Sequence, residues 1–519
     1  MAVALGVTAM SVAGTARAET RVVTDDDSLY IATRSANPGD VIEVEGGRTY
    51  KGRLFFGRGG TPGKPVIVRG VPKDGERPVI AGGDITISIE ADHFVFESLE
   101  ITQGEARCVF VAGHDVILRD LVIHHCKYHG LLSADEGSGS LLVDRCEFYE
   151  SGEGDRHHQI YVTSDQFKNP GSTFRLQHSY VHESNGGNSV KSRAERNEIY
   201  FNWIEGAKWH EIELIGPDVR NPPEIREDSD VVGNVFVKHN PVAHGVRIGG
   251  DGTMDTDGRF RFVNNTFVML NGTRSAIRLF EGVESVELYN NAFFAVDGAP
   301  VILFRTDKVE WTKGKAQVIG SHNFIPDGSQ NVPDQLTATI GGSSPKLVDP
   351  AGRDYRPAEG SPLIDAGAEA WPTHPDAPFP SPLTEIRFHP PIHTLGAPQP
   401  RPKRDTFDVG ALEAGTAPPP SANASPLPTA STRATAAPAT PSAARPTTGS
   451  KENRCMCSTI GAADDDGLGW WLVLGLAMGL RRRRGRPQGD ELVTAHATAP
   501  PTARGRRRDR RGRRGSSPR

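Results

Sequence analysis

A short motif that recurs along most of the chain limits the available folds more than any other feature. Each copy is a run of apolar, β-favouring residues with one polar residue near its middle and an apolar pair after it, from FVFESLEI at 94–101 to HNFI at 322–325. Nine copies leave eight intervals, which span 225 residues at about 28 each. Strands this short at this period, with no helical pattern between them, predict an all-β fold, a single-stranded right-handed parallel β-helix (solenoid). The central residues are Ser98, Asp120, Arg145, His178, Asn202, Asn234, Asn265, Asn291 and Asn323.

The last five centres are all asparagine, from Asn202 to Asn323. Equivalent residues on successive coils of such a solenoid lie about 4.8 Å apart, which suits hydrogen bonds between stacked amides. We therefore predict an inward-facing asparagine ladder with a structural role. The composition agrees, because 57 Gly, 39 Pro and 7% aromatic residues suit a turn-rich β protein better than a kinase-like, dehydrogenase-like or all-α enzyme.

Five cysteines in 519 residues are too few for a disulfide scaffold, and the CxxC spacing typical of zinc sites is missing from the sequence. Cys108, Cys126 and Cys146 follow one another at 18 and 20 residues, close to the length of one coil. This spacing favours stacked, buried thiols, with one disulfide as the alternative.

The two ends of the chain have the composition of processing segments. Residues 1–18 are typical of a secretory signal peptide, because an apolar stretch precedes the A-x-A cleavage site at 16–18. We expect the solenoid domain at 19–413. Residues 414–454 are rich in Pro, Ala, Ser and Thr, which predicts a disordered linker. The charge is uneven as well, with +11 on residues 481–519 and −16 on residues 1–480.

Cys455 and Cys457 are followed by a short apolar run at 467–480 and an arginine cluster at 481–484. Fourteen apolar residues are fewer than the ~20 of a stable span, so we predict a transient membrane anchor. The order of these features over 455–484 resembles the MYXO-CTERM sorting signal, which implies a sorting protease as partner and a secreted or cell-surface location. Residues 485–519 form a basic tail that we expect to be disordered, with no nucleic-acid partner.

A second set of strands carries polar side chains that can be aligned from coil to coil. The segments HGLLS, HQIYV, NSVKS, HEIEL, HGVRI and SAIRL, from 129 to 279, share one inward apolar position. Because side chains alternate between faces, the next residues form an outward column of Leu132, Tyr161, Lys191, Glu213, Arg247 and Arg278. The residues before the inward position give a second outward column of Gln159, Ser189 and Glu211. The strand starts give a row of His129, His158, Asn188, His210 and His244.

These residue types suit β-elimination of a uronate polysaccharide, which needs a group to neutralise the sugar carboxylate, a base and an acid. Lys191 is the candidate base, with Arg247 or Tyr161 as its partner. The charges of Arg193 and Arg247 would lower the pKa of Lys191, whereas Glu213 would raise it. The alternative is a surface salt-bridge ladder of Lys191, Glu213 and Arg247. The predicted substrate-binding residues are His158, Asn188, Glu211, Glu213, His244 and Arg278.

Segments 36–50 and 59–70 resemble the opening coils of the pectate-lyase-like β-helix superfamily, and 354–368 with 407–413 resemble its closing segment. Segment 188–204 resembles the Lys-Ser motif of polysaccharide lyase family 6. This resemblance implies Lys191 as base, an arginine of the next coil as acid, and Ca²⁺ that neutralises the carboxylate. Ser184 and Gly186 stand where that family has acidic ligands, and HEIELIG follows instead of an arginine-bearing strand. The cofactor therefore stays open. A transition-metal site at His157 or His158 is a weaker hypothesis, and no metal ligand is assigned.

Three functions are consistent with this sequence. The first is a surface-displayed enzyme that acts on polysaccharide, most simply a lyase working along the Lys191 face. The second is a non-catalytic rod or adhesin that binds glycan. The third is a hydrolase whose paired carboxylates would be Glu211 and Glu213. The fold alone does not choose among them, because β-helices support many activities.

Overall fold

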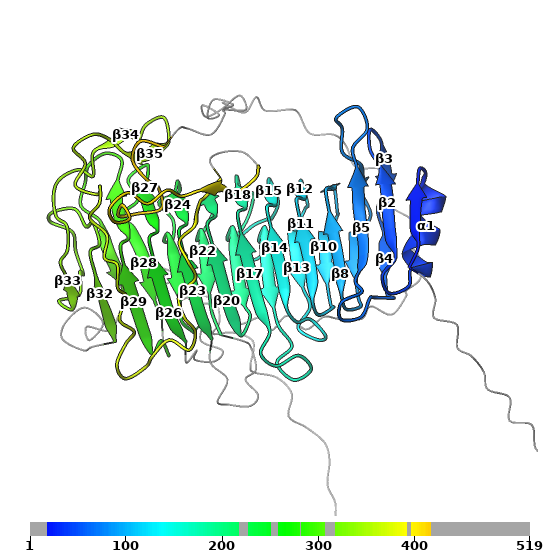
Figure 1. The fold of residues 1–519 in the computed structure, drawn as a ribbon, viewed down its shortest axis with the longest axis horizontal. Helices are drawn as coiled ribbons and strands as arrows, with labels where there is room; N and C mark the ends of the chain where they lie inside the picture. The colour runs from blue at the N-terminus through cyan, green and yellow to red at the C-terminus, as the bar shows by residue number, and fades with distance from the viewer. Residues whose placement is uncertain are drawn as a thin grey trace, which may run out of the picture. The chain divides into compact units, whose positions relative to one another are not determined.

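The computed structural model describes residues 18–216, 227–250, 258–280, 282–306, 317–391 and 396–416. Within them the chain winds through three parallel sheets in a fixed order, sheet A, then sheet B, then sheet C (Figure 1). Sheet A has 13 strands and sheets B and C have 10 each, and every strand pairs with its equivalents in the neighbouring coils. The predicted fold class, an all-β parallel β-helix, is therefore confirmed.

Most strands have three to five residues, because each side of a coil is short. Sheet A contains β1 (Thr20–Val23), β2 (Val41–Glu45), β5 (Val66–Val71), β8 (Phe94–Glu97), β11 (Val116–Arg119), β14 (Leu141–Asp144), β17 (Thr173–Gln177), β20 (Arg196–Tyr200), β23 (Asp228–Val232), β26 (Arg259–Val263), β29 (Ser285–Tyr289), β32 (Val318–Ser321) and β33 (Leu336–Thr337). Sheet B contains β3 (Thr49–Lys51), β6 (Val79–Ala81), β9 (Glu100–Thr102), β12 (Val122–His124), β15 (Glu147–Tyr149), β18 (Tyr180–His182), β21 (Trp203–Glu205), β24 (Val235–Lys238), β27 (Thr266–Met269) and β30 (Ala292–Ala295). Sheet C contains β4 (Leu54–Phe56), β7 (Ile85–Ile89), β10 (Arg107–Val111), β13 (His129–Ser133), β16 (Ile160–Thr163), β19 (Val190–Arg193), β22 (Ile212–Leu214), β25 (Val246–Ile248), β28 (Ser275–Leu279) and β31 (Ile302–Arg305).

One helix, α1 (Asp26–Ser35), covers the N-terminal end of the solenoid (Figure 1). Asp25 caps it, because its side chain accepts a hydrogen bond from the Ser28 backbone N–H while Ser28 reaches back to the N-cap. Leu29 and Ala32 on its inner face join the main hydrophobic core. The helix thus closes apolar surface that the first coil leaves without a neighbour.

The bend from sheet A to sheet B corrects the predicted alignment of the repeat. Ser98, Asp120, Arg145 and His178 have positive φ, like Phe201 and Gly233 in later coils, so they occupy the bend and their side chains do not turn inward. The inward position is the next residue in each case. The inner column therefore reads Leu99, Leu121, Cys146, Ser179, Asn202, Asn234, Asn265, Asn291 and Asn323, all fully buried. The first four centres were placed one residue too early, because in those coils the strongly polar residue occupies the bend, and the inward residue is Leu, Leu, Cys or Ser.

The asparagine ladder itself is confirmed. The Asn234 side-chain oxygen accepts hydrogen bonds from the backbone N and the Nδ2 of Asn202, at 2.9 and 3.0 Å. The Nδ2 of Asn234 in turn donates to the Asn265 Oδ1 at 3.0 Å, and the pattern repeats through Asn291 to Asn323. Each amide thereby satisfies backbone groups that the bend removes from the sheets.

The cysteines differ from the favoured prediction. Cys108 and Cys126 form a disulfide across 18 residues, and only Cys146 among the described cysteines is a free, buried thiol. Cys108 lies on β10 of sheet C and Cys126 follows β12 of the next coil, so the bond joins two successive coils near the corner between sheets B and C. The alternative of one disulfide is therefore the correct one.

After the last coil the chain returns along the outside of the solenoid and carries two short antiparallel ribbons, β34 (Leu347–Asp349) with β35 (Asp354–Pro357), and β36 (Phe388–His389) with β37 (Gln399–Pro400). Asn264 Nδ2 donates to the carbonyl oxygens of Asp408 and Gly410, which fixes the returning chain on the bend between sheets A and B. The expected closing segments, 354–368 and 407–413, belong to this return.

Several predicted segments lie outside the described residues: nearly all of the signal peptide at 1–18 and of the linker at 414–454, the sorting signal at 455–484 with its apolar run at 467–480, and the tail at 485–519. In the part of the chain that the structure describes, α1 is too short and too polar to span a membrane, and no other helix qualifies.

Candidate functional site

The outer face of sheet C carries the column of side chains that the sequence predicted. Tyr161 pairs with Lys191, Lys191 with Glu213, Glu213 with Arg247, and Arg247 with Arg278 on adjacent strands. The column extends in both directions, to Leu132, Phe110, Ser88 and Phe55 on the N-terminal side and to Arg305 on the C-terminal side. We call this set the sheet C column. Its N-terminal half is mostly apolar and its C-terminal half is charged.

Glu213 lies at the centre of the charged half. Its Oε2 accepts a hydrogen bond from Asn188 Nδ2 at 2.7 Å and lies 3.4 Å from Lys191 Nζ, and its Oε1 is ion-paired with Arg247. Burial alone would raise the pKa of Glu213, but the charges of Lys191 and Arg247 outweigh it and hold that pKa well below 4.5. Glu213 is therefore a carboxylate at neutral pH, and the alternative reading of a Lys191–Glu213–Arg247 salt-bridge ladder describes these contacts.

Tyr161 and Arg193 form a second polar pair beside this ladder. Arg193 Nε donates to Tyr161 Oη at 3.1 Å, and Lys191 Nζ lies over the Tyr161 ring, 5.2 Å from its centroid. Arg193 is almost buried and ends β19, while Tyr161 is half-buried. Because Arg193 donates to the phenol oxygen, the hydroxyl proton of Tyr161 can be directed toward a ligand on the outer face.

The row at the strand starts is a hydrogen-bonded ladder of its own. His129 Nδ1 accepts from the backbone N of His158 at 3.1 Å, and His158 Nδ1 accepts from that of Asn188 at 2.9 Å. Asn188 uses its Oδ1 in the same way toward the backbone N of His210 at 3.0 Å. His210 Nδ1 completes the series by accepting from His244 N at 3.2 Å. Asn188 thus replaces a histidine without breaking the ladder, and its Nδ2 remains available for Glu213.

The histidines of this ladder are neutral at pH 7 because they are buried. Burial lowers the pKa of His129 and of His210 to about 3 and that of His244 to about 2. Burial and the nearby Lys191 charge hold the pKa of His158 well below 6.5. A neutral imidazole whose Nδ1 accepts a hydrogen bond carries its proton on Nε2. His158, 5.5 Å from the Tyr161 ring, is therefore a hydrogen-bond donor and not a base.

The second outward column was wrong. Gln159, Ser189 and Glu211 are fully buried, because they precede the strands of sheet C at the corner where the chain arrives from sheet B. Glu211 accepts hydrogen bonds from the Ala207 backbone N and lies 3.7 Å from the Lys238 Nζ, which is buried as well. A ligand on the outer face does not reach Glu211. The hydrolase hypothesis loses its carboxylate pair for the same reason.

The remaining predicted residues lie farther along the column. Arg247 and Arg278 are both over the Phe280 ring, with their guanidinium carbons 4.0 and 4.8 Å from its centroid. His244 hydrogen-bonds to Ser275 Oγ at 2.9 Å through Nδ1. Phe280 and Arg305 were missed by sequence reasoning. Arg305 had a detectable signal, because it follows the inward Phe304 in ILFR as Arg278 follows Ile277.

The positions that would hold Ca²⁺ do not fit that ion. Ser184 donates its hydroxyl to the Gly186 carbonyl at 2.5 Å. A Cβ at Gly186 would meet the Glu153 backbone at 2.3 to 2.7 Å, so an acidic side chain has no room there. His157 stacks on Tyr128 at 4.2 Å while His158 belongs to the ladder, so the two histidines do not share a site. Among the described residues, no group of three or more His, Cys, Asp or Glu has the geometry of a metal site.

The chain matches no family model and no curated protein. Its similarities are to solved structures: pectate lyase Pel9A (13% identity, 77% of this chain and 97% of that chain, TM-score 0.48) and the alginate lyase of Paenibacillus sp. strain FPU-7 (15% identity, 56% and 98%, TM-score 0.37). A third is a family 6 polysaccharide lyase from Pseudopedobacter saltans (14% identity, 62% and 92%, TM-score 0.40). Likeness at this level concerns the fold, and a function has to be derived from the side chains.

Proposed function

We propose that this chain binds an acidic polysaccharide along the sheet C column and cleaves it by β-elimination beside Lys191 and Tyr161. The observation that carries the proposal is the order of the column, in which apolar side chains give way to polar and charged ones: Tyr161, Lys191, Glu213, Arg247, Arg278 and Arg305. Successive side chains repeat at about 4.8 Å, a spacing that suits an extended polymer with one acidic group per sugar.

The residues divide the chemistry among them as follows. Arg247 neutralises the sugar carboxylate, which acidifies the proton on the adjacent carbon. Lys191, once deprotonated, takes that proton, the electron pair forms the C=C bond, and the glycosidic oxygen leaves with a proton from Tyr161. His158 Nε2 and Asn188 orient the sugar. Lys191 is paired with Glu213 and has to lose its own proton before it can act as the base.

The test is a variant that keeps the ion pair but does not release a proton. Lys191→Arg preserves the charge beside Glu213, and a general base contributes about 10²- to 10⁴-fold to the rate. We expect Lys191→Arg and Tyr161→Phe each to lose at least ~100-fold in formation of unsaturated product from pectate, alginate or other uronate polymers, followed by ultraviolet absorbance. The control Lys64→Arg, on an exposed loop, should be unaffected. Full activity of Lys191→Arg would leave Lys191 as a charge only.

A second candidate function is glycan binding without cleavage, which the closed Lys191–Glu213–Arg247 network favours. It predicts retardation of the wild-type chain in gels that contain an acidic glycan, with no unsaturated product from any polymer of the panel. Arg247→Ala would then reduce the retardation while Lys191→Arg would not.

Export and display at the cell envelope are part of the same proposal. They rest on the sequences of residues 1–18 and 455–484, with a sorting protease and a transient membrane anchor as partners. Proteolysis of intact cells, followed by detection with an antibody to the β-helix, is the test. A signal that survives in intact cells and disappears only after lysis would contradict surface display.

A further inference from the structure

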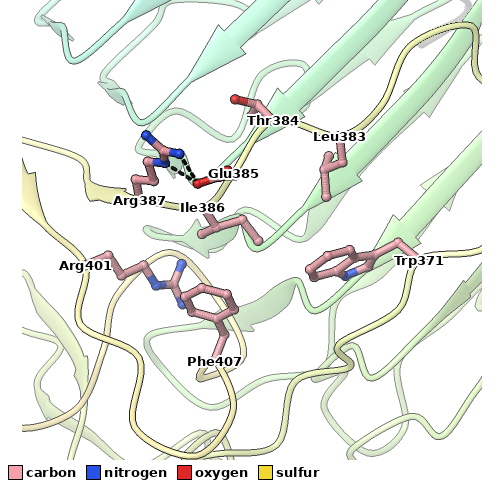
Figure 2. Close-up of a pocket in the computed structure, with 8 residues that line it drawn as sticks. All are labelled: Trp371, Leu383, Thr384, Glu385, Ile386, Arg387, Arg401 and Phe407. Atoms are coloured by element: carbon pink, nitrogen blue, oxygen red, sulfur yellow. Dashed lines mark hydrogen bonds and ion pairs between the residues drawn. The ribbon is translucent and has the colours of Figure 1, made fainter.

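A cavity lies under the returning chain, on the outer side of sheet A and thus on a different sheet from the candidate site (Figure 2). Its volume is about 380 Å³, within the range of small-molecule sites. Trp371, Leu383, Ile386 and Phe407 give it apolar walls, and all four come from the returning chain. Figure 2 shows Trp371 on one side of the space and Phe407 on the other, next to the Arg401 guanidinium.

Two of the residues that line this cavity have a buried donor without a partner in the described part of the chain. Arg401 has a fully buried side chain, whose Nε donates to Glu413 at 2.6 Å and whose Nη2 donates to the Asp408 carbonyl at 3.0 Å. Its Nη1 has no partner among the described residues, and neither has Nε1 of Trp371. A buried donor left unpaired costs about 1–3 kcal/mol, so each of these groups favours a ligand that brings an acceptor.

The lining indicates the chemistry of that ligand. The charges are balanced, because Arg401 pairs with Glu413 and Arg387 pairs with Glu385. The donors that lack partners are a guanidinium and an indole, and a guanidinium prefers planar carboxylates. The Arg401 guanidinium lies over the Phe407 ring at 5.2 Å, so a carboxylate held by Nη1 would place its carbon ring beside the aromatic walls.

We infer that this cavity is a second binding site, which takes a single sugar acid. The carboxylate accepts from Arg401 Nη1, a hydroxyl oxygen of the sugar accepts from Trp371 Nε1, and the C–H face of the sugar packs on Phe407 and Ile386. The carboxylate part of the inference rests on the cavity alone, while the choice of a sugar rests on the proposed function. A cleavage product or chain end of the acidic polysaccharide would bind here while the polymer occupies the sheet C column.

The test is calorimetric titration of the full chain with glucuronate and galacturonate against their neutral counterparts, glucose and galactose. We expect the uronates to bind at least ~10-fold more tightly than the hexoses. Leu383→Trp fills the cavity without touching Arg401 and should abolish binding. Trp371→Phe keeps an aromatic side chain, loses the Nε1 donor and should weaken binding about fivefold. Thermal melts confirm that both variants fold.

Equal binding of uronate and hexose, no uronate binding at all, or binding that persists in Leu383→Trp would each overturn the inference. Lys191→Ala separates it from the proposed function, because that variant leaves the cavity intact. Uronate binding by Lys191→Ala at wild-type affinity supports the second site whatever the lyase assay shows. Loss of uronate binding in Lys191→Ala would place the sugar acid on the sheet C column and contradict the second site.

Discussion

Glu213 contacts Asn188, Lys191 and Arg247 on the two coils that flank it, and all of these side chains are largely withdrawn from solvent. A carboxylate between two cations keeps both of them in place with a smaller net charge. The neutral His158 beside it adds a donor and no charge. The candidate site is therefore a preorganised set of charges whose net positive charge is reduced by one acidic residue.

Glu213→Gln is expected to lower the free energy of unfolding at pH 7 by about 3 kcal/mol, because it leaves two buried cations without their partner. The folded-state pKa of Glu213 is depressed, so its contribution is present above pH 4.5 and is lost as the pH falls toward the folded pKa. The difference between wild type and variant should shrink below pH 4.5. Urea unfolding at pH 7, 5, 4 and 3 measures the difference in unfolding free energy. The control is Glu43→Gln at a partly exposed ion pair, which should cost less than ~1 kcal/mol. A pH-independent difference would contradict the assignment.

At the scale of the elements, two side-chain ladders hold the coils in register outside the sheets. The asparagine ladder satisfies backbone groups inside the bend between sheets A and B, and the histidine ladder does so at the start of sheet C. Both work by one acceptor per coil, which in the asparagine ladder takes the backbone N–H of the preceding coil and in the histidine ladder that of the following coil. A substitution in either ladder therefore affects two neighbouring coils.

Asn234→Leu should show this for the asparagine ladder. It leaves Asn202 N, Asn202 Nδ2 and the Ile199 carbonyl without their partner, and we expect a loss of about 3 kcal/mol in unfolding free energy. Asn240→Ala, which removes two exposed hydrogen bonds, should cost less than ~1 kcal/mol because water replaces the lost partners. Guanidinium unfolding followed by circular dichroism compares the two variants, and equal losses would mean that the ladder carries no special stability.

The disulfide gives a second prediction at this scale. Cys108 and Cys126 close a loop of 18 residues, for which the chain-entropy model gives about 3 kcal/mol. The double variant Cys108→Ser/Cys126→Ser should lose about this much, and a reductant should destabilise wild type but not the variant. Cys146 should stay unreactive toward thiol reagents in both proteins until they unfold, because it is fully buried. Labelling of Cys108 and Cys126 in unfolded, unreduced protein, located by peptide mapping, would contradict the disulfide.

At the scale of the whole molecule, the net negative charge of the chain opposes binding of the proposed acidic polysaccharide. Residues 1–480 carry −16, which repels a polyanion, and the cations of the sheet C column have to overcome this locally. Attraction of this kind acts over about 8–10 Å at moderate ionic strength.

Binding of an acidic glycan should therefore weaken steadily as NaCl rises from 20 to 300 mM. Arg278→Ala should bind more weakly at low salt and depend less on salt than wild type, because one contributing cation is gone. Affinity electrophoresis over the salt series measures both. An affinity that does not change with salt would indicate recognition by neutral contacts and move the proposed binding face away from the column.

The sequence by itself determined the solenoid, the asparagine ladder and the polar column of sheet C, because each repeats once per coil and period is readable from a single chain. In four repeats the predicted inward position lies one residue too early, since polarity does not distinguish a bend residue such as His178 from the inward Ser179 that follows it. Three outcomes became visible only in the three-dimensional structure. Cys108 bonds Cys126, and Glu211 is internal while Glu213 faces outward. Trp371 and Arg401 line the same cavity. These outcomes depend on how corners and returning segments pack in space, and no period in the sequence encodes that.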